Sequence, residues 1–269
     1  MKGREHMAVF SVTMHSHALQ RNVPLMILYP SDTEDPKTGR YEKARQIRVL
    51  YLLHGFEGCC NDWLYNTRIK LLARQHRIAV VMPSGENLFY NDVSTVRGNF
   101  EQFLTEDLIA FMENTFHVSR KREDRLIAGL SMGGYGAIVN GLRHPELYSV
   151  IGGFSSALLD SRLAKMSVSK RPEDAEALTW YCHLFSVADI REYTGSRNDC
   201  SALARTVPAD QRPVVYLSCG TEDSLYPASE SFASLLDTLG YQLTWEKWTG
   251  DHNWKFWDES IERFLTQCL

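Results

Sequence analysis

A serine between glycines is the strongest candidate for covalent chemistry in this sequence. Ser131 is the central residue of the segment 129–133, Gly-Leu-Ser-Met-Gly, and Gly134 follows it. A short stretch at 125–128, apolar after Arg125, precedes the segment, and residues typical of a helix come after it. A serine on a sharp turn between a strand and a helix projects its hydroxyl from the strand end, and glycines beside it avoid collisions with neighbouring backbone. We therefore predict that Ser131 is a nucleophile; the alternative is a structural serine in a glycine-rich turn.

A serine hydroxyl is a poor nucleophile at neutral pH, so it needs a histidine base and a carboxylate that orients the histidine. For a nucleophile on a strand–turn–helix, the acid and then the histidine follow the serine in the chain. Only three histidines follow Ser131, namely His144, His183 and His252. We predict that His252 is the base, because the segment 249–254 forms a turn between the last apolar run and the last helix. His144 is expected to pack or to face solvent.

Two neighbouring carboxylates compete for the role of the orienting acid. The segment 217–223 leaves an apolar run and enters a turn that contains Glu222 and Asp223. Asp223 is the favoured acid and Glu222 is the competitor. Asp251 adjoins His252 in the chain and could hardly reach the far nitrogen of its ring, so we expect it to form the turn or to cap a helix.

A tetrahedral intermediate also requires hydrogen-bond donors for its oxyanion. The backbone N–H of Met132, directly after the nucleophile, is the first candidate. The second is expected in the loop after an earlier strand, and the segment 52–58 has a strand running into a glycine-containing turn. The N–H of Phe56 is the preferred donor, with Gly55 as the alternative. His54 could be a second base, but we expect it to pack or to form hydrogen bonds within this loop.

Several aromatic residues are candidates for the walls of a substrate pocket. Phe89 and Tyr90 lie in a loop after an apolar run, and Trp180 lies in a polar stretch further along the chain. These three could enclose a small acyl group, although ordinary loop packing explains them equally well. Tyr226, three residues after Asp223, is a further candidate for contact with the substrate.

The elements that must position these residues follow from the hydrophobic pattern. Short apolar runs predict strands at 9–14, 25–29, 49–53, 78–82, 125–128, 149–151, 214–217 and 243–245. Apolar residues at helical spacing predict helices within 63–72, 100–112, 135–143, 232–239 and 254–265. Strands that alternate with helices indicate βαβ crossovers, so we expect a mostly parallel sheet with helices on both faces.

The pattern indicates one domain over residues 7–269. Residues 158–210 look irregular and polar, and an insertion at this place could cap a pocket or be a surface excursion without a role. Residues 1–6 resemble a cloning leader, and 31–43 are expected to form an exposed loop.

Composition excludes several classes of function. The 29 Lys and Arg residues against 33 Asp and Glu residues give a net charge of -4, with no basic cluster for nucleic acid or an anionic membrane. No apolar run approaches the roughly 18 residues that a membrane-spanning helix needs, and no secretory signal follows the charged N-terminus. The 6 cysteines show no Cys-x-x-Cys spacing and predict neither a zinc site nor a disulfide framework. We expect a cytoplasmic protein with reduced thiols.

Taken together, these motifs resemble the esterase D/tributyrin esterase group of α/β-hydrolases, whose relatives include S-formylglutathione hydrolases, feruloyl and acetyl-xylan esterases, and mycolyltransferases. The matching segments are 53–58 with Trp63, 81–83, 128–136, 219–223 with Leu225 and Tyr226, and 250–252 with Trp254 and Trp257. They occur in the order of the family and span most of the chain. The similarity is greatest to the short-chain tributyrin esterases.

The resemblance implies an α/β-hydrolase fold and a carboxylesterase with Ser131, Asp223 and His252 as its triad. It implies no metal or organic cofactor and a small-molecule ester as the partner, with a homo-oligomer left open. Two departures concern the pocket. The segment 59–60, Cys-Cys, replaces more polar residues, where we expect small buried or pocket-wall thiols, and the stretch after residue 158 matches only loosely.

The resulting hypothesis is hydrolysis of short-chain acyl esters through an acyl-enzyme on Ser131. Thioester cleavage as in S-formylglutathione hydrolases, or cleavage of feruloyl or acetyl-carbohydrate esters, is the alternative. Acyl transfer to an alcohol is a further alternative, and so is a hydrolase fold that only binds a ligand.

Overall fold

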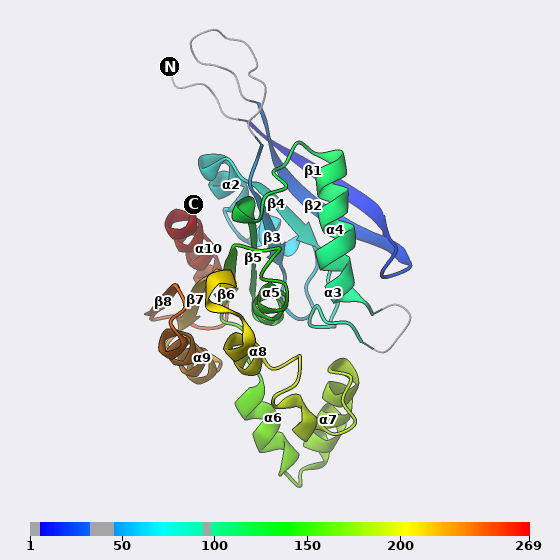
Figure 1. Cartoon of the computed structure of the whole chain (residues 1–269), viewed down its shortest axis with the longest axis vertical. Helices are drawn as coiled ribbons and strands as arrows, with labels where there is room; N and C mark the ends of the chain where they lie inside the picture. Colours follow the sequence, from blue (N-terminus) through cyan, green and yellow to red (C-terminus); the bar gives the residue numbers. More distant parts are fainter. Residues whose placement is uncertain (1–5, 33–45, 94–97) are drawn as a thin grey trace.

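A single eight-stranded sheet organises the chain over residues 6–32, 46–93 and 98–269, which are the residues that the computed structural model describes (Figure 1). The strands are β1 (His6–Ser16), β2 (Arg21–Asp32), β3 (Val49–Leu53), β4 (Ala79–Pro83), β5 (Arg125–Leu130), β6 (Val150–Phe154), β7 (Val214–Gly220) and β8 (Leu243–Trp248). Their order in the sheet is β1-β2-β4-β3-β5-β6-β7-β8. The pairs β1/β2 and β2/β4 are antiparallel, and from β4 to β8 all neighbours are parallel.

Helices cover both faces of the sheet. They are α1 (Asp62–Asn66), α2 (Ile69–His76), α3 (Phe100–Gln102), α4 (Leu108–Thr115), α5 (Met132–Arg143), α6 (Asp160–Ser167), α7 (Pro172–Leu184), α8 (Cys200–Thr206), α9 (Tyr226–Leu239) and α10 (Trp254–Cys268). A π-helical turn, Phe103–Asp107, joins α3 to α4. Residues of α1, α2 and α10 pack on one face, and residues of α4, α5, α8 and α9 belong to the core on the other.

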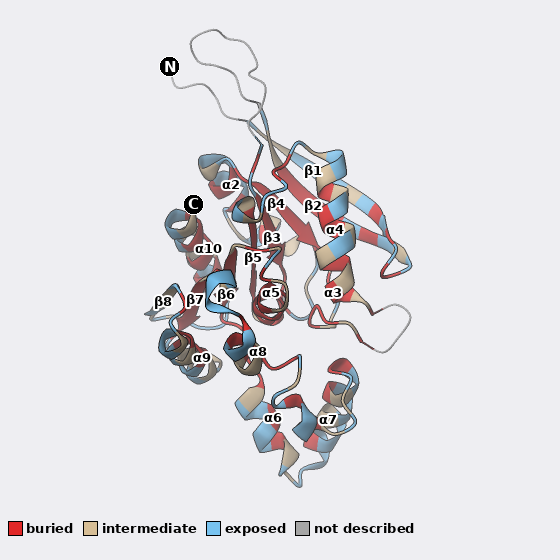
Figure 2. Ribbon diagram, in the orientation of Figure 1, coloured by how far each residue is buried: buried red, intermediate tan, exposed pale blue. Residues whose placement is uncertain are grey.

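The central strands are buried on both faces, which explains their continuous apolar sequences. Every residue of β3, β4, β5 and β6 is buried, and Figure 2 shows these strands in red behind helices whose outer sides are exposed. Parallel strands with helices on both faces need apolar side chains in both directions. The predicted strands all overlap the observed ones, and the predicted α/β-hydrolase fold is confirmed.

One predicted helix is in fact two. Residues 63–72 are interrupted because Thr67 adopts an extended backbone with φ -138° and ψ 172°, so α1 ends at Asn66 and α2 begins at Ile69. The Thr67 hydroxyl donates to the carbonyl of Trp63 and accepts from the N–H of Ile69. These local hydrogen bonds compete with continued helix.

The segment between β6 and β7 is helical, so the prediction of an irregular stretch over 158–210 was wrong. It contains α6, α7 and α8 together with the 3₁₀ turns Ile190–Tyr193 and Ala209–Gln211. Figure 1 shows α6 and α7 as a lobe at the lower end of the molecule, with α8 between the lobe and the sheet. Each helix is short and buries only a few residues, such as Leu163 and Met166 of α6, so no long apolar stripe marks it in the sequence. We call residues 158–210 the helical insertion.

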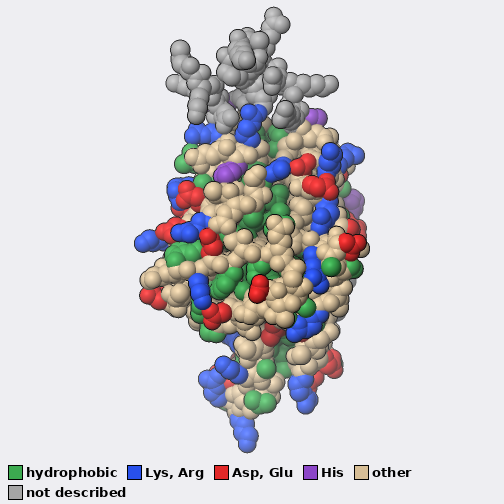
Figure 3. Space-filling model, turned by 60° about the vertical axis from the view of Figure 1, so that its left-hand side comes forward, with side chains coloured by type: hydrophobic (Ala, Val, Ile, Leu, Met, Phe, Trp, Pro, Cys, Tyr) green, Lys and Arg blue, Asp and Glu red, His purple; other side chains and the backbone are tan. Residues whose placement is uncertain are grey.

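Two predicted segments lie mostly outside the residues that the structure describes. The leader predicted at 1–6 lies outside the described residues except for His6, which begins β1. The loop predicted at 31–43 also lies outside them, except for two residues at the end of β2. None of the helices described is long and apolar enough to cross a membrane. On the face drawn in Figure 3, charged side chains of both signs are interspersed rather than gathered by sign.

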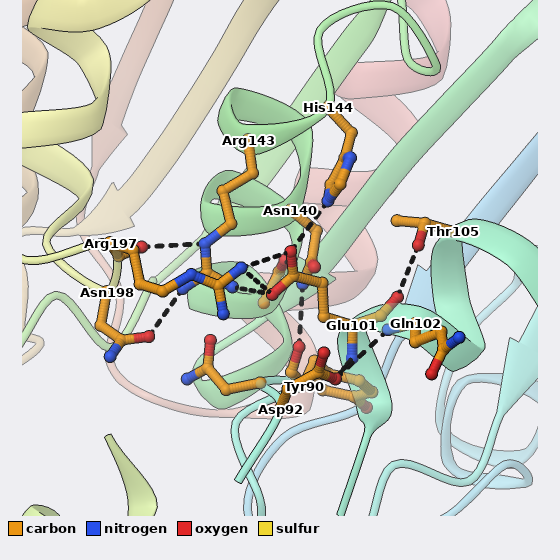
Figure 4. A network of polar contacts seen from close by, with 12 residues as sticks. Tyr90, Asp92, Glu101, Gln102, Thr105, Asn140, Arg143, His144, Arg197 and Asn198 are labelled. Atoms are coloured by element: carbon orange, nitrogen blue, oxygen red, sulfur yellow. Dashed lines mark hydrogen bonds and ion pairs between the residues drawn. The ribbon is translucent and has the colours of Figure 1, made fainter. Parts of the chain in front are cut away.

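A buried carboxylate ties the helical insertion to the core (Figure 4). Glu101 of α3 is 5% exposed and contacts Arg143 at the end of α5, His144 just after it and Arg197 of the insertion. Asn198 accepts a hydrogen bond from the same Arg143 guanidinium at 2.6 Å. Three chain segments therefore meet at one carboxylate. His144 is not a free surface residue but a member of this cluster.

Burial raises the pKa of Glu101, but hydrogen bonding to His144 and the charges of Arg143 and Arg197 lower it more, to about 2. A carboxyl whose pKa is lowered on folding contributes stability above its ordinary pKa of 4.5 and loses that contribution as the pH falls toward 2. The cluster is therefore expected to stabilise the protein at neutral pH and to fail in acid.

Replacing Glu101 by glutamine is expected to lower the free energy of unfolding at pH 7 by about 3 kcal/mol, because Arg143 would keep a buried charge without its carboxylate. Urea denaturation measures the change. The gap from the wild type should narrow as the pH falls from 4.5 toward 2, because the carboxyl of Glu101 takes up a proton in the unfolded chain below about 4.5 while the folded protein holds it ionised. The matched control is Arg197→Gln, which removes a 57% exposed partner and should cost less than about 1 kcal/mol. A larger loss in the control than in Glu101→Gln would contradict the prediction.

Candidate active site

Ser131 lies at a strained turn between β5 and α5. Its φ of 51° and ψ of -117° fall in a region that residues with side chains rarely adopt. The turn is held in place because Ser131 N–H donates to the carbonyl of Phe154 and its own carbonyl accepts from Tyr135 and Ala157. This geometry projects the Ser131 side chain beyond the carboxyl end of the central strand.

Glycine is required on both sides of the serine for steric reasons. A Cβ on Gly133 would lie 2.5 Å from the carbonyl oxygens of both Leu53 and His54, which belong to the neighbouring strand β3 and its loop. A Cβ on Gly129 would lie 2.4 Å from the carbonyl oxygen of Gly133. The spacing of the G-x-S-x-G segment thus follows from the close approach of three backbone segments.

The residues predicted as nucleophile, base and acid lie in one row that is joined by hydrogen bonds. Nε2 of His252 is 3.0 Å from Oγ of Ser131, and Nδ1 of His252 is 2.8 Å from Oδ2 of Asp223. Ser131 follows β5, Asp223 follows β7, and His252 lies between β8 and α10. Because these strands are parallel, their carboxyl ends meet at one edge of the sheet, which brings together residues up to 121 positions apart in the chain.

Asp223 is the inner member of the row. It is 3% exposed, and it accepts a hydrogen bond from the N–H of Leu225 at 2.9 Å. Burial alone would raise the pKa of Asp223. Hydrogen bonds from His252, Leu225 and Ser155 lower it by more than burial raises it, so the pKa lies below the ordinary value. The ionised carboxylate can therefore hold the Nδ1–H of His252 at neutral pH.

The competing carboxylates take other positions. Glu222 is exposed, and its N–H donates to the carbonyl of Gly250. Asp251 accepts from the backbone N–H of His252, so it forms the turn as expected. The cap of α10 is Asn253, whose side chain accepts from the N–H of Phe256.

Two backbone N–H groups border the serine. Met132 is the first residue of α5, where helix N–H groups lack an intrahelical acceptor. The Gly55–Phe56 peptide lies beside the serine, since a Cβ on Gly55 would be 3.5 Å from the Cβ of Ser131. Among the described residues, no backbone hydrogen bond is donated by the N–H of Phe56 or of Met132.

A hollow of about 430 Å³ opens at the serine. Its lining comprises Gly55, Phe56, Glu57, Gly58, Asp62, Leu130, Ser131, His252, Trp254 and Trp257. The lining combines aromatic walls with two carboxylates and contains neither lysine nor arginine. Sequence analysis missed Glu57, Asp62 and Trp257 as pocket residues. Glu57 and Trp257 belong to segments that resemble the esterase family, whereas Asp62 is marked only by its position shortly after Phe56 in the chain.

Aromatic side chains from three segments meet at Phe56. Its ring centroid is 6.4 Å from that of Phe89 and 5.9 Å from that of Trp180, which belongs to α7 of the helical insertion. Phe89 and Trp180 are themselves 6.1 Å apart. We call these three residues the aromatic wall. Phe89 and Trp180, predicted as pocket residues, are not among the residues that line the hollow, but both pack against Phe56, which is.

Tyr90 and Tyr226 do not line the hollow, which corrects their prediction as pocket residues. Tyr90 is fully buried and donates its hydroxyl to the carbonyl of His54. Tyr226 begins α9, and its hydroxyl contacts Glu230 and Lys247 on the surface beside β8.

The remaining candidates are the cysteines and side chains that could bind a metal ion. Cys59 is exposed and contacts Asp62 at 3.3 Å, while Cys60 is buried. Within residues 6–32, 46–93 and 98–269, no group of three or more His, Cys, Asp or Glu side chains could hold a metal ion.

The sheet order and the strand–turn–helix at Ser131 place the chain in the class of α/β-hydrolases, and solved structures of that fold superpose on nearly its whole length. Residues 16–267 match the family model described as putative esterase. The chain therefore belongs to this esterase family and is a carboxylester hydrolase. The resemblance to the esterase D/tributyrin esterase group is confirmed.

Three of the proteins that are similar to this chain are hydrolases. The chain is 33% identical over 257 residues to an acetyl esterase of Caldicellulosiruptor saccharolyticus, covering 95% of this chain and 96% of that protein. It is similar to the fluorophosphonate-binding serine hydrolase F of Staphylococcus aureus, with a TM-score of 0.81, 25% identity, and 97% and 98% of the two chains covered. An S-formylglutathione hydrolase of Staphylococcus aureus shares the fold, with a TM-score of 0.80, 24% identity, and 98% and 99% coverage.

Proposed function

We propose that the protein is a serine carboxylesterase that hydrolyses short-chain acyl esters through an acyl-enzyme on Ser131. The observation that carries this proposal is the row of hydrogen bonds from Ser131 through His252 to Asp223. Membership of the esterase family and similarity to an acetyl esterase support it.

In the first step, Nε2 of His252 takes the proton of Ser131 as Oγ attacks the carbonyl carbon of the ester. Asp223 holds the ring and stabilises its positive charge. The N–H groups of Phe56 and Met132 bind the oxyanion of the tetrahedral intermediate. The carbon–oxygen bond to the alcohol then breaks, and the alcohol leaves with the proton from His252. In the second step, His252 deprotonates a water that attacks the acyl carbon. The bond from this carbon to Oγ of Ser131 then breaks, the carboxylic acid leaves, and Ser131 receives the proton from His252.

The aromatic wall supports a short acyl group. The leaving alcohol must lie beside His252 to receive its proton, so the acyl chain extends away from His252. The N–H of Phe56 binds the oxyanion, and the side chain of Phe56 packs against the other two residues of the aromatic wall. Two of the wall residues, Phe89 and Trp180, pack edge to face within about 6 Å and limit the space for a long chain.

The charge of the hollow favours an ester over S-formylglutathione. Glu57 and Asp62 line the same hollow as His252, without a cation among the lining residues. Glutathione as a leaving group carries two carboxylates, and like charges at close range repel. A neutral alcohol meets no such repulsion, and the Trp254 and Trp257 rings offer it apolar contact.

A substrate panel tests the proposal on the full chain. p-Nitrophenyl acetate and butyrate should be cleaved with higher kcat/KM than the octanoyl ester, a feruloyl ester or S-formylglutathione. A fluorophosphonate probe should label Ser131, as peptide mass spectrometry would show. Faster cleavage of S-formylglutathione than of acetyl esters would favour the alternative function, and absence of any cleavage by the folded protein would favour a binding role.

Replacing Trp180 by alanine is expected to raise kcat/KM for the octanoyl ester relative to the acetyl ester by about tenfold, because removal of the indole opens the aromatic wall. Steady-state kinetics on the two esters measures the ratio. Phe10→Ala is the matched control, since Phe10 is 39% exposed against 38% for Trp180 but lies on β1. An unchanged ratio in Trp180→Ala would refute the role of this wall.

A further inference from the structure

His54 touches the loop that borders Ser131, yet the proton-transfer row does not use it. The residue is 1% exposed and lies directly after β3. Its Nδ1 lies 2.7 Å from the carbonyl oxygen of Gly55, and its Nε2 lies 2.8 Å from the N–H nitrogen of Gly85. The ring thus bridges the loop after β3 and the loop after β4.

The partners of the ring determine its tautomer. The N–H of Gly85 can only donate, so Nε2 of His54 must be unprotonated and accept. The proton then resides on Nδ1, which donates to the carbonyl of Gly55. Burial lowers the pKa of His54, outweighing the opposing effects of the Gly55 carbonyl and the Asp62 carboxylate, so the neutral ring is favoured.

The Gly55 carbonyl belongs to the same peptide unit as the N–H of Phe56. A trans peptide is planar, with its C=O and N–H pointing in opposite directions. Besides Nδ1–H of His54, the N–H of Gly58 also donates to the Gly55 carbonyl at 3.2 Å. Two donors that hold the oxygen on one side therefore direct the Phe56 N–H to the other side, next to Ser131.

We propose that His54 is a positioning residue for the oxyanion hole. Its neutral ring fixes the Gly55–Phe56 peptide plane, so that the Phe56 N–H faces the developing negative charge and the Gly55 carbonyl oxygen does not. The bond to Gly85 anchors the ring itself against the loop after β4. This inference rests on the proposed function, because it concerns the donors of the same reaction.

The contact with Gly55 is the one that orients the peptide, and two variants separate it from the contact with Gly85. In His54→Asn, the side-chain amide can replace Nδ1–H and still donate to Gly55. In His54→Gln, the side-chain carbonyl can replace Nε2 and still accept from Gly85. Each variant keeps one of two hydrogen bonds, so both should lose similar stability.

His54→Gln is expected to lower kcat on p-nitrophenyl acetate by about tenfold to a hundredfold, less than the 10²–10³ that complete loss of an oxyanion donor costs. Its KM should change by less than about twofold, because the donor acts mainly on the transition state. His54→Asn should recover most of the lost kcat. Asn87→Ala, which removes the acceptor for the Glu57 N–H in the same pair of loops, should keep kcat within about twofold.

The inference is overturned if His54→Gln is at least as active as His54→Asn at equal folded fraction, or if Asn87→Ala loses as much kcat as His54→Gln. ¹⁵N NMR of histidine-labelled wild-type protein tests it without substitution, and His54 must show a protonated Nδ1 and an unprotonated Nε2 at pH 7. An Nε2–H tautomer or a cationic ring would end it. Failure of the wild type to hydrolyse any ester would instead count against the proposed function.

Discussion

Replacing Ser131 by alanine is expected to lower kcat on p-nitrophenyl acetate by about 10⁴-fold or more. The variant keeps the aligned N–H groups and the hollow but has no atom that can form the acyl-enzyme. The residual rate should resemble that of stabilised attack by water. Steady-state and single-turnover kinetics measure the loss, and the initial burst of p-nitrophenol should disappear with it.

A serine outside the proposed active site provides the control for this variant. Ser234 lies on the exposed side of α9, where its hydroxyl donates to the carbonyl of Glu230. Ser234→Ala should keep the wild-type kcat and the wild-type labelling by a fluorophosphonate probe. Labelling that persists in Ser131→Ala would show that another residue is the nucleophile.

Much of the fold could be predicted because buried parallel strands leave a simple signature. Apolar runs as short as 49–53 and 126–128, followed by turn residues, favour buried strands over helices, because a helix needs a longer stretch. The helical insertion left no such signature, because its helices divide their few apolar residues between contacts with one another and with the core. One of its contacts with the core, between Glu101 and Arg197, joins residues that are far apart in the chain.

The site could be predicted where chain order and local sterics decide it. The glycines around Ser131 and the order of the acid and the histidine after it are both visible in the sequence. The pocket was less accessible, because the direction of a side chain depends on backbone angles that residue types do not reveal. Phe89 and Tyr90 are adjacent, buried and have positive φ, yet Phe89 packs against Phe56 of the aromatic wall while Tyr90 hydrogen-bonds to the carbonyl of His54.

The choice between Asp223 and Glu222 yields the second large effect. Replacing Asp223 by asparagine is expected to lower kcat by about 10⁴-fold at neutral pH. An asparagine amide can donate to Nδ1 of His252, and the ring proton then moves to Nε2. The ring would donate to Ser131 where it must accept, so the base is lost although the three residues keep their places.

Glu222→Gln removes a carboxylate one residue away and should change kcat by less than about twofold. The two variants differ in what they touch: Asp223 is 3% exposed and bonded to His252, whereas Glu222 is exposed. Because the pKa of Asp223 lies below its ordinary value of 3.8, its carboxylate is ionised throughout the neutral range, and the loss in Asp223→Asn at neutral pH compares a charged with a neutral partner of His252. Equal losses of kcat in the two variants would mean that both carboxylates act only through their negative charge near the site. The specific effect requires that only the buried carboxylate governs the tautomer of the base.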